Sequence, residues 1–419
     1  MNVNSLSALQ VLAGLSLAIW LYLVLFRGQF WRVDLASEQP APFQFLRSLP
    51  PLSSSAALLT SDFEPGLPTV TVVIPARNEA TVLPCSLASL LSQTYGGRTQ
   101  VILVDDQSDD DTSAVARRTS EELGCSAQLQ ILEGTPLPRG WSGKLWAMAQ
   151  GVARSEEMEQ ASKYFLFTDA DIVHDPGNLA RLVARAEAGQ LSMVSLMVRL
   201  RCTSFWEAWL IPAFVFFFQK LYPFRWVNAP SHAMAAAAGG CILIRRDALE
   251  RIGGLAVIHR ALIDDCSLAQ AVKRNDRNVF GKGRLWLGLS DSTRSLRSYP
   301  DLDSIWTMVA RTAFSQLDHS PFLLAGTLVG MGLIYLMPPF GLAMGFLLSN
   351  PVLVTLALGG WMLMTIAFVP MLRYYRLSPL RAIVLPLIGL LYSLMTFDSA
   401  LRYWRGRGGA WKGRTYEAG

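Results

Sequence analysis

Two aspartates, Asp169 and Asp171, follow an apolar run in the segment KYFLFTDADIVHDP at 163–176. The run Tyr164–Phe167 is typical of a buried strand, and residues two apart on an extended segment point to the same side. The two carboxylates would therefore meet at the end of the strand and repel each other unless a cation lies between them. One interpretation is a divalent-metal site. The other is that Asp171 caps the next helix, because Asp is a favoured N-cap residue.

Other predicted strands also end in polar residues. The β-branched run in TVTVVIPARNEA (69–80) stops at Pro75, and the strand predicted at 100–104 is followed by Asp105 and Asp106. Stretches with apolar residues at helical spacing separate these strands, which is typical of an α/β domain with a parallel sheet covered on both faces. Because ligands bind at the carboxyl ends of such strands, we expect these polar ends to form one site.

Several functions are excluded by motifs that the chain lacks. A calcium loop beginning at Asp106 would need Gly at its sixth position and Glu at its twelfth, where the chain has Asp111 and Arg117. The acids Asp109–Asp111 are better explained as the start of a helix. The sequence contains no P-loop, no G-x-G-x-x-G segment and no nucleic-acid motif, and its five cysteines form no C-x-x-C pair.

Uncharged apolar segments indicate an integral membrane protein. The chain is 51% hydrophobic and only 16% charged, against about 25% charged residues in soluble domains. Crossing a bilayer takes roughly 20 apolar residues, and the uncharged segments lie at 7–26, 322–349, 352–372 and 382–397. The first has no basic leader and no small-residue cleavage site, so we expect a retained anchor and not a signal peptide.

The order of these segments predicts the domain organisation. We expect a transmembrane anchor (1–30), a linker (31–68), a catalytic domain (69–318), transmembrane or re-entrant helices (319–401) and a basic tail (402–419). Basic flanks predict that the catalytic domain is cytoplasmic. Three C-terminal crossings would then place the basic tail outside, so either one segment is re-entrant or interfacial, or the first, interrupted by Pro338 and Pro339, crosses twice.

Five motifs in order carry a family resemblance: VVIPARNEA, VILVDDQSDDDT, GWSGKLWAMAQG, FTDADIVHDP and GGLAVIHRALIDDCSLAQAVKR. Over about 69–315 the chain resembles glycosyltransferase family 2, which has the GT-A fold, a Rossmann-like α/β fold of nucleotide-diphospho-sugar transferases. More narrowly, it looks like the bacterial hopene-associated glycosyltransferases. The resemblance implies a metal-dependent enzyme that uses Mg²⁺ or Mn²⁺ and a nucleoside-diphosphate sugar, with a UDP-sugar as the expected donor.

The resemblance also implies roles for the strand-end residues. Asp169 and Asp171 match the family's D-x-D motif, with Asp171 as the direct metal ligand and Asp169 supporting the ribose or the metal. A helix cap accounts for only one of these two acids. Lys144 stands where the family keeps a basic group near the diphosphate. The family's nucleotide-binding positions are matched by Pro75, Arg77, Glu79 and Asp106.

A second acidic pair matches the family's catalytic position. Asp264-Asp265 replaces the usual Glu-Asp, and the resemblance makes Asp265 the general base for the acceptor hydroxyl. A carboxylate that lies beside another carboxylate in a partly dry cleft should have a raised pKa.

Processive synthases carry the motif Gln-x-x-Arg-Trp. This chain keeps the arginine of the motif as Arg311, which we expect near the diphosphate, but it has Met308 at the Gln position and Thr312 at the Trp position. This favours transfer of a single sugar.

Two further segments have open interpretations. The aromatic stretch 205–226 is either a buried core helix or an interfacial segment that admits a lipid acceptor. The WKGR sequence at 411–414 either folds back toward the site or anchors the tail at the membrane.

The expected protein is a multi-pass enzyme of the bacterial inner (plasma) membrane that transfers one sugar to a lipid hydroxyl, a hopanoid by resemblance, with inversion and without a nucleic-acid partner. The alternatives are a polyprenyl-phosphate glycosyltransferase, a non-catalytic scaffold that binds nucleotide or lipid, and a transporter. The transporter is disfavoured because the spans carry almost no ionisable residues.

Overall fold

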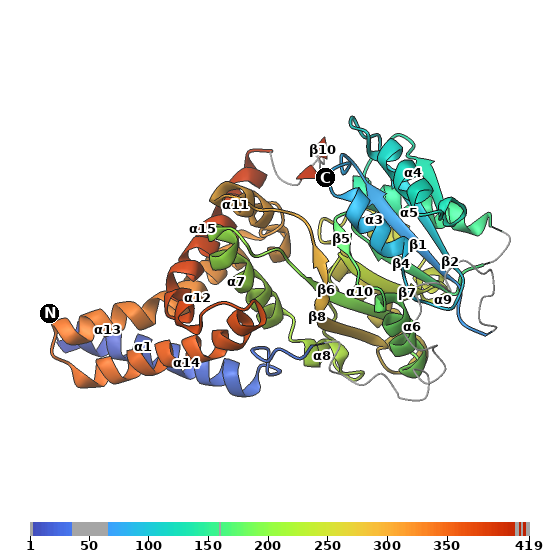
Figure 1. The fold of residues 1–419 in the computed structure, drawn as a ribbon. Coiled ribbons are helices and arrows are strands. Elements are labelled where there is room, and N and C mark those ends of the chain that lie inside the picture. The colour runs from blue at the N-terminus through green and yellow to red at the C-terminus, as the bar shows by residue number, and fades with distance from the viewer. Residues whose placement is uncertain (1–2, 36–65, 159–160, 407–409, 412–413, 416–419) are drawn as a thin grey trace.

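The computed structural model describes residues 3–35, 66–158, 161–406, 410–411 and 414–415. A sheet with flanking helices forms one part, and a group of apolar helices forms the other (Figure 1). Most of the predicted linker lies outside the described residues. After residue 406, the described part of the tail consists of two short paired strands, β9 (Ala410–Trp411) and β10 (Arg414–Thr415). The predicted roles of WKGR fall largely outside the described residues.

The sheet has eight strands in the order β3-β2-β1-β4-β7-β6-β8-β5. Their bounds are β1 (Val70–Ala76), β2 (Thr99–Asp105), β3 (Leu129–Glu133), β4 (Tyr164–Thr168), β5 (Ile172–Val173), β6 (Met193–Arg199), β7 (Cys241–Arg245) and β8 (Leu285–Ser295). Strands β3, β2, β1 and β4 are parallel, which confirms the predicted alternation in this half. The other half is mixed, because β7 enters antiparallel between β4 and β6, and β5 pairs antiparallel with β8.

Helices cover both faces of the sheet. They are α3 (Leu83–Leu91), α4 (Thr112–Glu122), α5 (Gly143–Glu156), α6 (Asn178–Ala188), α9 (Arg246–Arg251) and α10 (Asp264–Phe280). Alternate residues of β1 face opposite ways: Val72 and Ile74 pack in the core that includes α3 and α6, and Val73 packs in the core that includes α5 and α10. Because both faces are buried, β1 has the continuous apolar sequence that predicted it.

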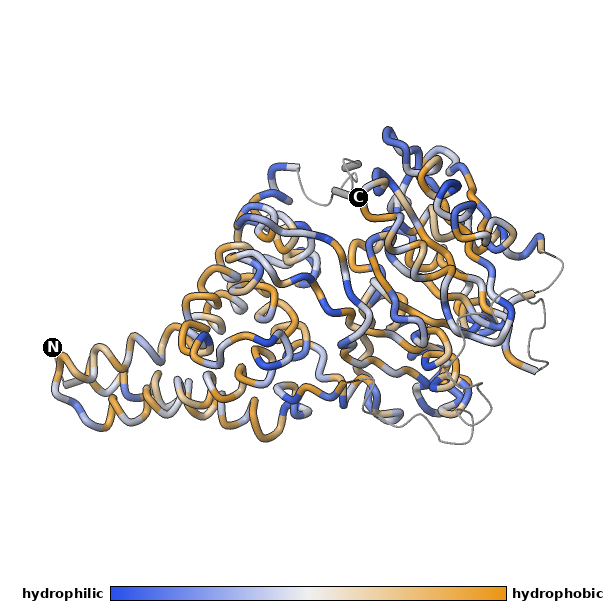
Figure 2. Tube along the Cα trace, viewed as in Figure 1, coloured by the Kyte–Doolittle hydropathy of each residue, from blue (hydrophilic) through white to orange (hydrophobic). Residues whose placement is uncertain are grey.

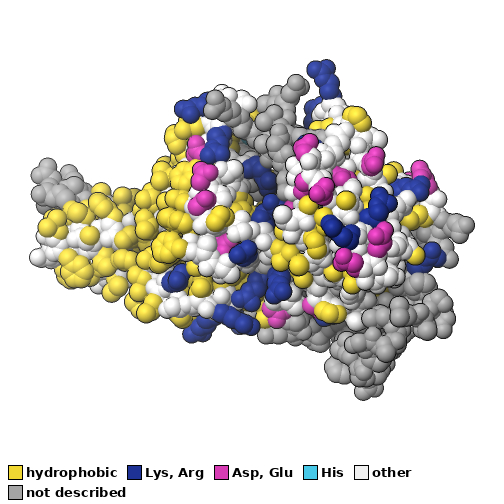
Figure 3. Space-filling model, turned by 45° about the horizontal axis from the view of Figure 1, so that its top comes forward, with side chains coloured by type: hydrophobic (Ala, Val, Ile, Leu, Met, Phe, Trp, Pro, Cys, Tyr) yellow, Lys and Arg dark blue, Asp and Glu magenta, His cyan; other side chains and the backbone are white. Residues whose placement is uncertain are grey.

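The apolar part contains four helices long and apolar enough to cross a membrane, among the residues that the structure describes. They are α1 (Val3–Phe26), the bent helix Pro321–Leu347, α14 (Pro351–Tyr374) and the segment Pro379–Trp404, which contains α15 (Leu385–Trp404). Figure 2 shows hydrophobic residues along most of their length, and Figure 3 shows hydrophobic side chains covering this part of the surface. The membrane prediction is therefore compatible with the structure.

The bent helix consists of α12 (Pro321–Met331), a π-helical turn η4 (Gly332–Leu336) and α13 (Met337–Leu347). Pro338 lies in the first turn of α13, where its missing N–H removes no hydrogen bond within that helix. Helix α13 lies beside α1 and α14, whereas α12 packs on α15 (Figure 1). The two halves therefore do not form a hairpin, and the hypothesis that this segment crosses twice is not supported.

The aromatic stretch forms α7 (Phe205–Leu221) and α8 (Phe224–Asn228), between β6 and β7. Helix α7 begins with a capping box between Ser204 and Glu207, and packs on α14, α15 and α11 (Leu302–Ala310). Phe216 is fully buried against Phe368 of α14. Of the two interpretations, the core helix fits the buried residues, and this helix joins the sheet to the apolar helices.

Candidate active site

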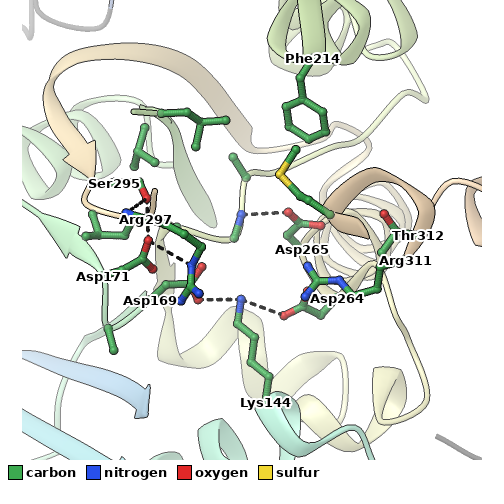
Figure 4. A pocket seen from close by; sticks show the side chains of 18 of the residues that line it. Lys144, Asp169, Asp171, Phe214, Asp264, Asp265, Ser295, Arg297, Arg311 and Thr312 are labelled. Carbon is green, nitrogen blue, oxygen red and sulfur yellow. Dashed lines mark hydrogen bonds and ion pairs between the residues drawn. The ribbon is translucent and has the colours of Figure 1, made fainter. Parts of the chain in front are cut away.

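A cavity of about 620 Å³ lies where the carboxyl ends of β1 and β4 face α7 and α11. Its size is within the range of small-molecule sites. Most of the predicted site residues line it: Pro75, Glu79, Lys144, Asp169, Asp171, Asp264, Asp265 and Arg311. Figure 4 shows the acids of two separate chain segments on either side of Lys144.

The first acidic pair stands at the end of β4, as predicted. Asp171 is 6% exposed, and its Oδ2 accepts a hydrogen bond of 2.5 Å from the Ser295 hydroxyl. The N–H of Leu296 donates to the Asp171 carbonyl at 2.8 Å. Two bonds thus attach the end of β8 to the acidic loop. Burial raises the pKa of Asp169, with Asp171 adding to the rise and Lys144 opposing it.

Lys144 lies in the first turn of α5 and connects the two acidic pairs. Its Nζ is 2.8 Å from Asp169 Oδ1 and 3.4 Å from Asp264 Oδ2. Burial alone would lower the pKa of Lys144, but the two carboxylates raise it above its usual range, so the side chain is an ammonium ion. Lys144 therefore lies inside the cavity as a charged group between the two acidic pairs.

The second acidic pair begins α10. The carboxylate of Asp265 accepts hydrogen bonds from the N–H groups of Gly239, at 2.8 Å, and Cys266, at 2.7 Å. Burial, followed by the charge of Asp264, raises the pKa of Asp265 to about 6. A Cβ at Gly239 would lie 3.1 Å from Lys144 Nζ and 3.4 Å from Asp265 Oδ2. The close approach of these side chains thus depends on glycine at this position.

Two predicted nucleotide-binding residues are placed differently from the rest. Arg77 donates to the carbonyls of Asp106, at 2.5 Å, and Gln107, at 3.0 Å, and neither Arg77 nor Asp106 lines the cavity. Arg77 holds the loop between β2 and α4, and Asp106 is fully buried at the end of β2. Pro75 and Glu79 do reach the cavity from the end of β1.

Sequence reasoning missed Arg297, which follows β8. Its Nη2 is 2.7 Å from Glu79 Oε1, and its Nε is 3.7 Å from Asp171 Oδ2. The signal in the sequence was weak: a run of serines and arginines, STRSLRS at 292–298, after an apolar strand. What places Arg297 here is the pairing of β8 with β5, in which Ser295 stands opposite Ile172.

The other end of the cavity is apolar. Phe214 and Phe218, four residues apart on α7, reach it together with Met308 of α11 and Met197 of β6. Figure 4 shows the Phe214 ring pointing toward the side of the cavity that holds Asp265. The cavity therefore combines a charged end, at the edge of the sheet, with an apolar end, at the helix that contacts the membrane-type helices.

The charged end fits a divalent cation. No cluster of three or more His, Cys, Asp or Glu ligands occurs among the described residues, but Mg²⁺ is commonly held by one or two carboxylates together with substrate phosphates. Asp169 and Asp171 supply hard oxygen ligands of this kind at the open end of a strand. The chemistry of the donor set therefore agrees with a metal that binds together with a diphosphate.

Comparison with known proteins supports this interpretation. Residues 71–253 match the family model described as Glycosyl transferase family 2. No curated protein matches the chain.

A solved structure agrees at the level of the fold. The mannosyltransferase PcManGT from Pyrobaculum calidifontis, in complex with GDP-Man and Mn²⁺, matches 94% of this chain and 99% of its own, at 18% identity and a TM-score of 0.50. The Mycobacterium tuberculosis glucosyl-3-phosphoglycerate synthase with Mn²⁺ and UDP-glucose matches 60% of this chain and 78% of its own, at 15% identity and a TM-score of 0.38. The GT-A fold and the family domain together support a glycosyltransferase.

Proposed function

We propose that the protein transfers one sugar from a nucleoside-diphosphate sugar to the hydroxyl of a membrane lipid, with inversion at the anomeric carbon. One observation carries this proposal: the same cavity has a charged end with two acidic pairs and an apolar end formed by α7. A donor needs the first end and an amphipathic acceptor needs both. A soluble acceptor without an apolar chain would leave the aromatic wall without a function.

The residues take the following roles in this proposal. Asp171 would bind Mg²⁺ or Mn²⁺ directly and Asp169 would support the metal or the ribose, while Lys144 faces the diphosphate. When bound, the metal would neutralise charge on the departing diphosphate. Arg311, at the end of α11, lines the cavity on the Asp264 side (Figure 4) and would add a further positive charge.

The reaction is a single displacement. Asp265 accepts the proton of the acceptor hydroxyl while that oxygen forms a bond with the anomeric carbon. The bond from this carbon to the diphosphate oxygen breaks, and its electron pair leaves with the nucleoside diphosphate. The two N–H groups of Gly239 and Cys266 hold the Asp265 carboxylate in a fixed orientation. No covalent enzyme intermediate is needed.

The acceptor and donor can be specified further as hypotheses. The resemblance to the hopene-associated glycosyltransferases makes a hopanoid the first acceptor to test, and a UDP-sugar is the expected donor. PcManGT was solved with GDP-Man, so the donor panel must include guanine nucleotides.

We also propose that α1, α14 and the bent helix Pro321–Leu347 cross the membrane, the bent helix with its first turns in the interface, while α15 lies at the membrane surface next to the catalytic domain. Helix α1 is about 36 Å long, enough for the roughly 30 Å hydrocarbon core. Gln10 of α1 hydrogen-bonds to Asn350 at the far end of this bundle, and Arg27 at the near end donates to carbonyls of α7. The basic near end favours the cytoplasmic side.

Helix α15 differs because its polar side chains hydrogen-bond to α11 and α7, the helices that lie next to the sheet. Asp398 accepts from the Trp306 indole at 2.8 Å and pairs with Arg402 at 2.8 Å, and the Tyr392 hydroxyl donates to the Leu210 carbonyl at 2.9 Å. If α15 does not cross, the bent helix and α14 form one outward and one returning crossing. The tail then lies on the side of the catalytic domain, which removes the conflict with the positive-inside rule.

The direct test measures release of nucleoside diphosphate from a panel of UDP- and GDP-sugars by detergent-purified protein, with lipid extract and Mn²⁺. We expect turnover with one donor, dependent on lipid, and abolished by chelator, by Asp171→Ala and by Asp265→Ala. A product on a polyprenyl phosphate in place of a hydroxyl lipid would favour the phosphate-acceptor enzyme. Tight nucleotide binding without turnover on any acceptor would favour a scaffold.

A further inference from the structure

Arg297 lies in the charged end of the cavity although no sequence motif placed it there. Its guanidinium group lies between two acids, 2.7 Å from Glu79 Oε1 and 3.7 Å from Asp171 Oδ2. Lys144 does the same on the other side, between Asp169 and Asp264. Each cation therefore lies between two carboxylates that come from different segments of the chain.

The backbone near Arg297 is held independently of its side chain. The Ser295 hydroxyl and the Leu296 N–H both bond to Asp171, at 2.5 Å and 2.8 Å. A long arginine side chain can therefore change partner without any movement of the loop that carries it. The guanidinium fork also suits a phosphate group, to which it can donate two parallel hydrogen bonds.

We propose that Arg297 is a donor-responsive positioning residue, which neutralises Asp171 and Glu79 before the donor binds and turns to the diphosphate when metal and donor bind. The proposal rests on the proposed function, because it takes Asp171 as a metal ligand. Its physical basis is electrostatic, because a guanidinium 3.7 Å from Asp171 Oδ2 partly cancels the charge that attracts a divalent cation and repels the cation itself. A bound metal would repel the guanidinium in turn and favour its rotation toward the anionic diphosphate.

Removing the guanidinium should change two affinities in opposite directions. Without the guanidinium, one positive charge fewer opposes a metal at Asp171, so Mn²⁺ alone should bind about threefold tighter or more. The diphosphate loses a charge-assisted hydrogen-bond donor, so UDP or GDP in the presence of saturating Mn²⁺ should bind about tenfold weaker or more. A residue that only supports the fold would weaken both.

The experiment measures the binding of Mn²⁺ alone by electron paramagnetic resonance, and of UDP and GDP with Mn²⁺ by calorimetry, on the full chain in detergent. The variants are Arg297→Gln and Arg297→Lys, with Arg294→Gln as the matched control, because Arg294 is exposed near the end of β8, three residues before Arg297. We expect opposite shifts in Arg297→Gln, smaller shifts in Arg297→Lys, and no shift in the control.

Equal shifts of one sign in Arg297→Gln and Arg297→Lys, or no shift in either, would overturn the proposal. Thermal unfolding of each variant shows whether it is folded. If Arg297→Gln is not folded, Arg297→Lys alone tests the proposal, again by whether Mn²⁺ affinity rises and nucleotide affinity falls. Asp171→Ala distinguishes failure of the proposed metal site from failure of the proposed role of Arg297. Loss of Mn²⁺ binding in Asp171→Ala upholds the metal site of the proposed function whatever Arg297 does, whereas unchanged Mn²⁺ binding overturns both.

Discussion

Replacement of Asp265 by Asn tests the proposed base directly. The variant keeps the shape of the side chain and an oxygen that can accept from Gly239 or Cys266, but it cannot take a proton. Positioned general bases contribute about 10²- to 10⁴-fold to rate, or about 3–5 kcal/mol of activation free energy. We therefore expect Asp265→Asn to lower kcat by at least about a hundredfold while the affinity for the nucleoside diphosphate stays unchanged.

The pH dependence of the unmodified protein adds a second, independent signature. The proposed base acts only when ionised, and burial together with Asp264 raises the pKa of Asp265 to about 6. About nine-tenths of the groups are then ionised at pH 7 and about one-tenth at pH 5, so kcat/KM should fall about tenfold between them. Asp264→Asn removes a charge that raises this pKa, so the acidic limb should move to lower pH.

The assay is nucleoside diphosphate release over pH 5–8 with the best donor found, alongside product detection on the lipid. If Asp265→Asn retained most of its activity, or if its residual activity kept the same acidic limb, another group would be the base. A loss of nucleotide affinity in this variant would instead indicate a disturbed site. Measuring that affinity therefore distinguishes a disturbed site from the loss of the base alone.

Three further changes follow from the same geometry. Gly239→Ala places a methyl group against Lys144 and Asp265, so kcat should fall about tenfold or more in the release assay; unchanged turnover would contradict the close packing. Phe218→Ala shortens the apolar wall, so KM for the lipid should rise about tenfold while donor affinity is kept; equal effects on both would refute its assignment to the acceptor. Ser349 is exposed between α13 and α14, so Ser349→Cys should react with a membrane-impermeant maleimide in intact cells. A fluorescent protein fused to the C-terminus should fluoresce on the cytoplasmic side. Protection of Ser349→Cys from the maleimide would reverse the proposed orientation.

Much of the fold follows from local pattern, and the misses have a common physical cause. Strands β1, β2 and β4 could be predicted because burial on both faces requires a continuous apolar run, and acids that end such runs stand out. The order of β6, β7 and β8 could not, because it depends on pairings between distant segments. The role of Arg77 also depends on non-local geometry, since only the folded loop brings its guanidinium to the carbonyl of Asp106.

The position of α7 in the chain explains why one cavity has both a charged and an apolar end. The segment leaves the sheet at the end of β6, forms α7 against the apolar helices, and returns to β7 through Gly239 and Gly240. The same excursion thus supplies Phe214 and Phe218 at the acceptor end and the N–H group that fixes the proposed base Asp265. Acceptor recognition and base orientation thus depend on one excursion of the chain, whose backbone is anchored between the two ends by Lys273, bonded to the Val227 and Met234 carbonyls, and by Ser195, bonded to the Ala238 N–H.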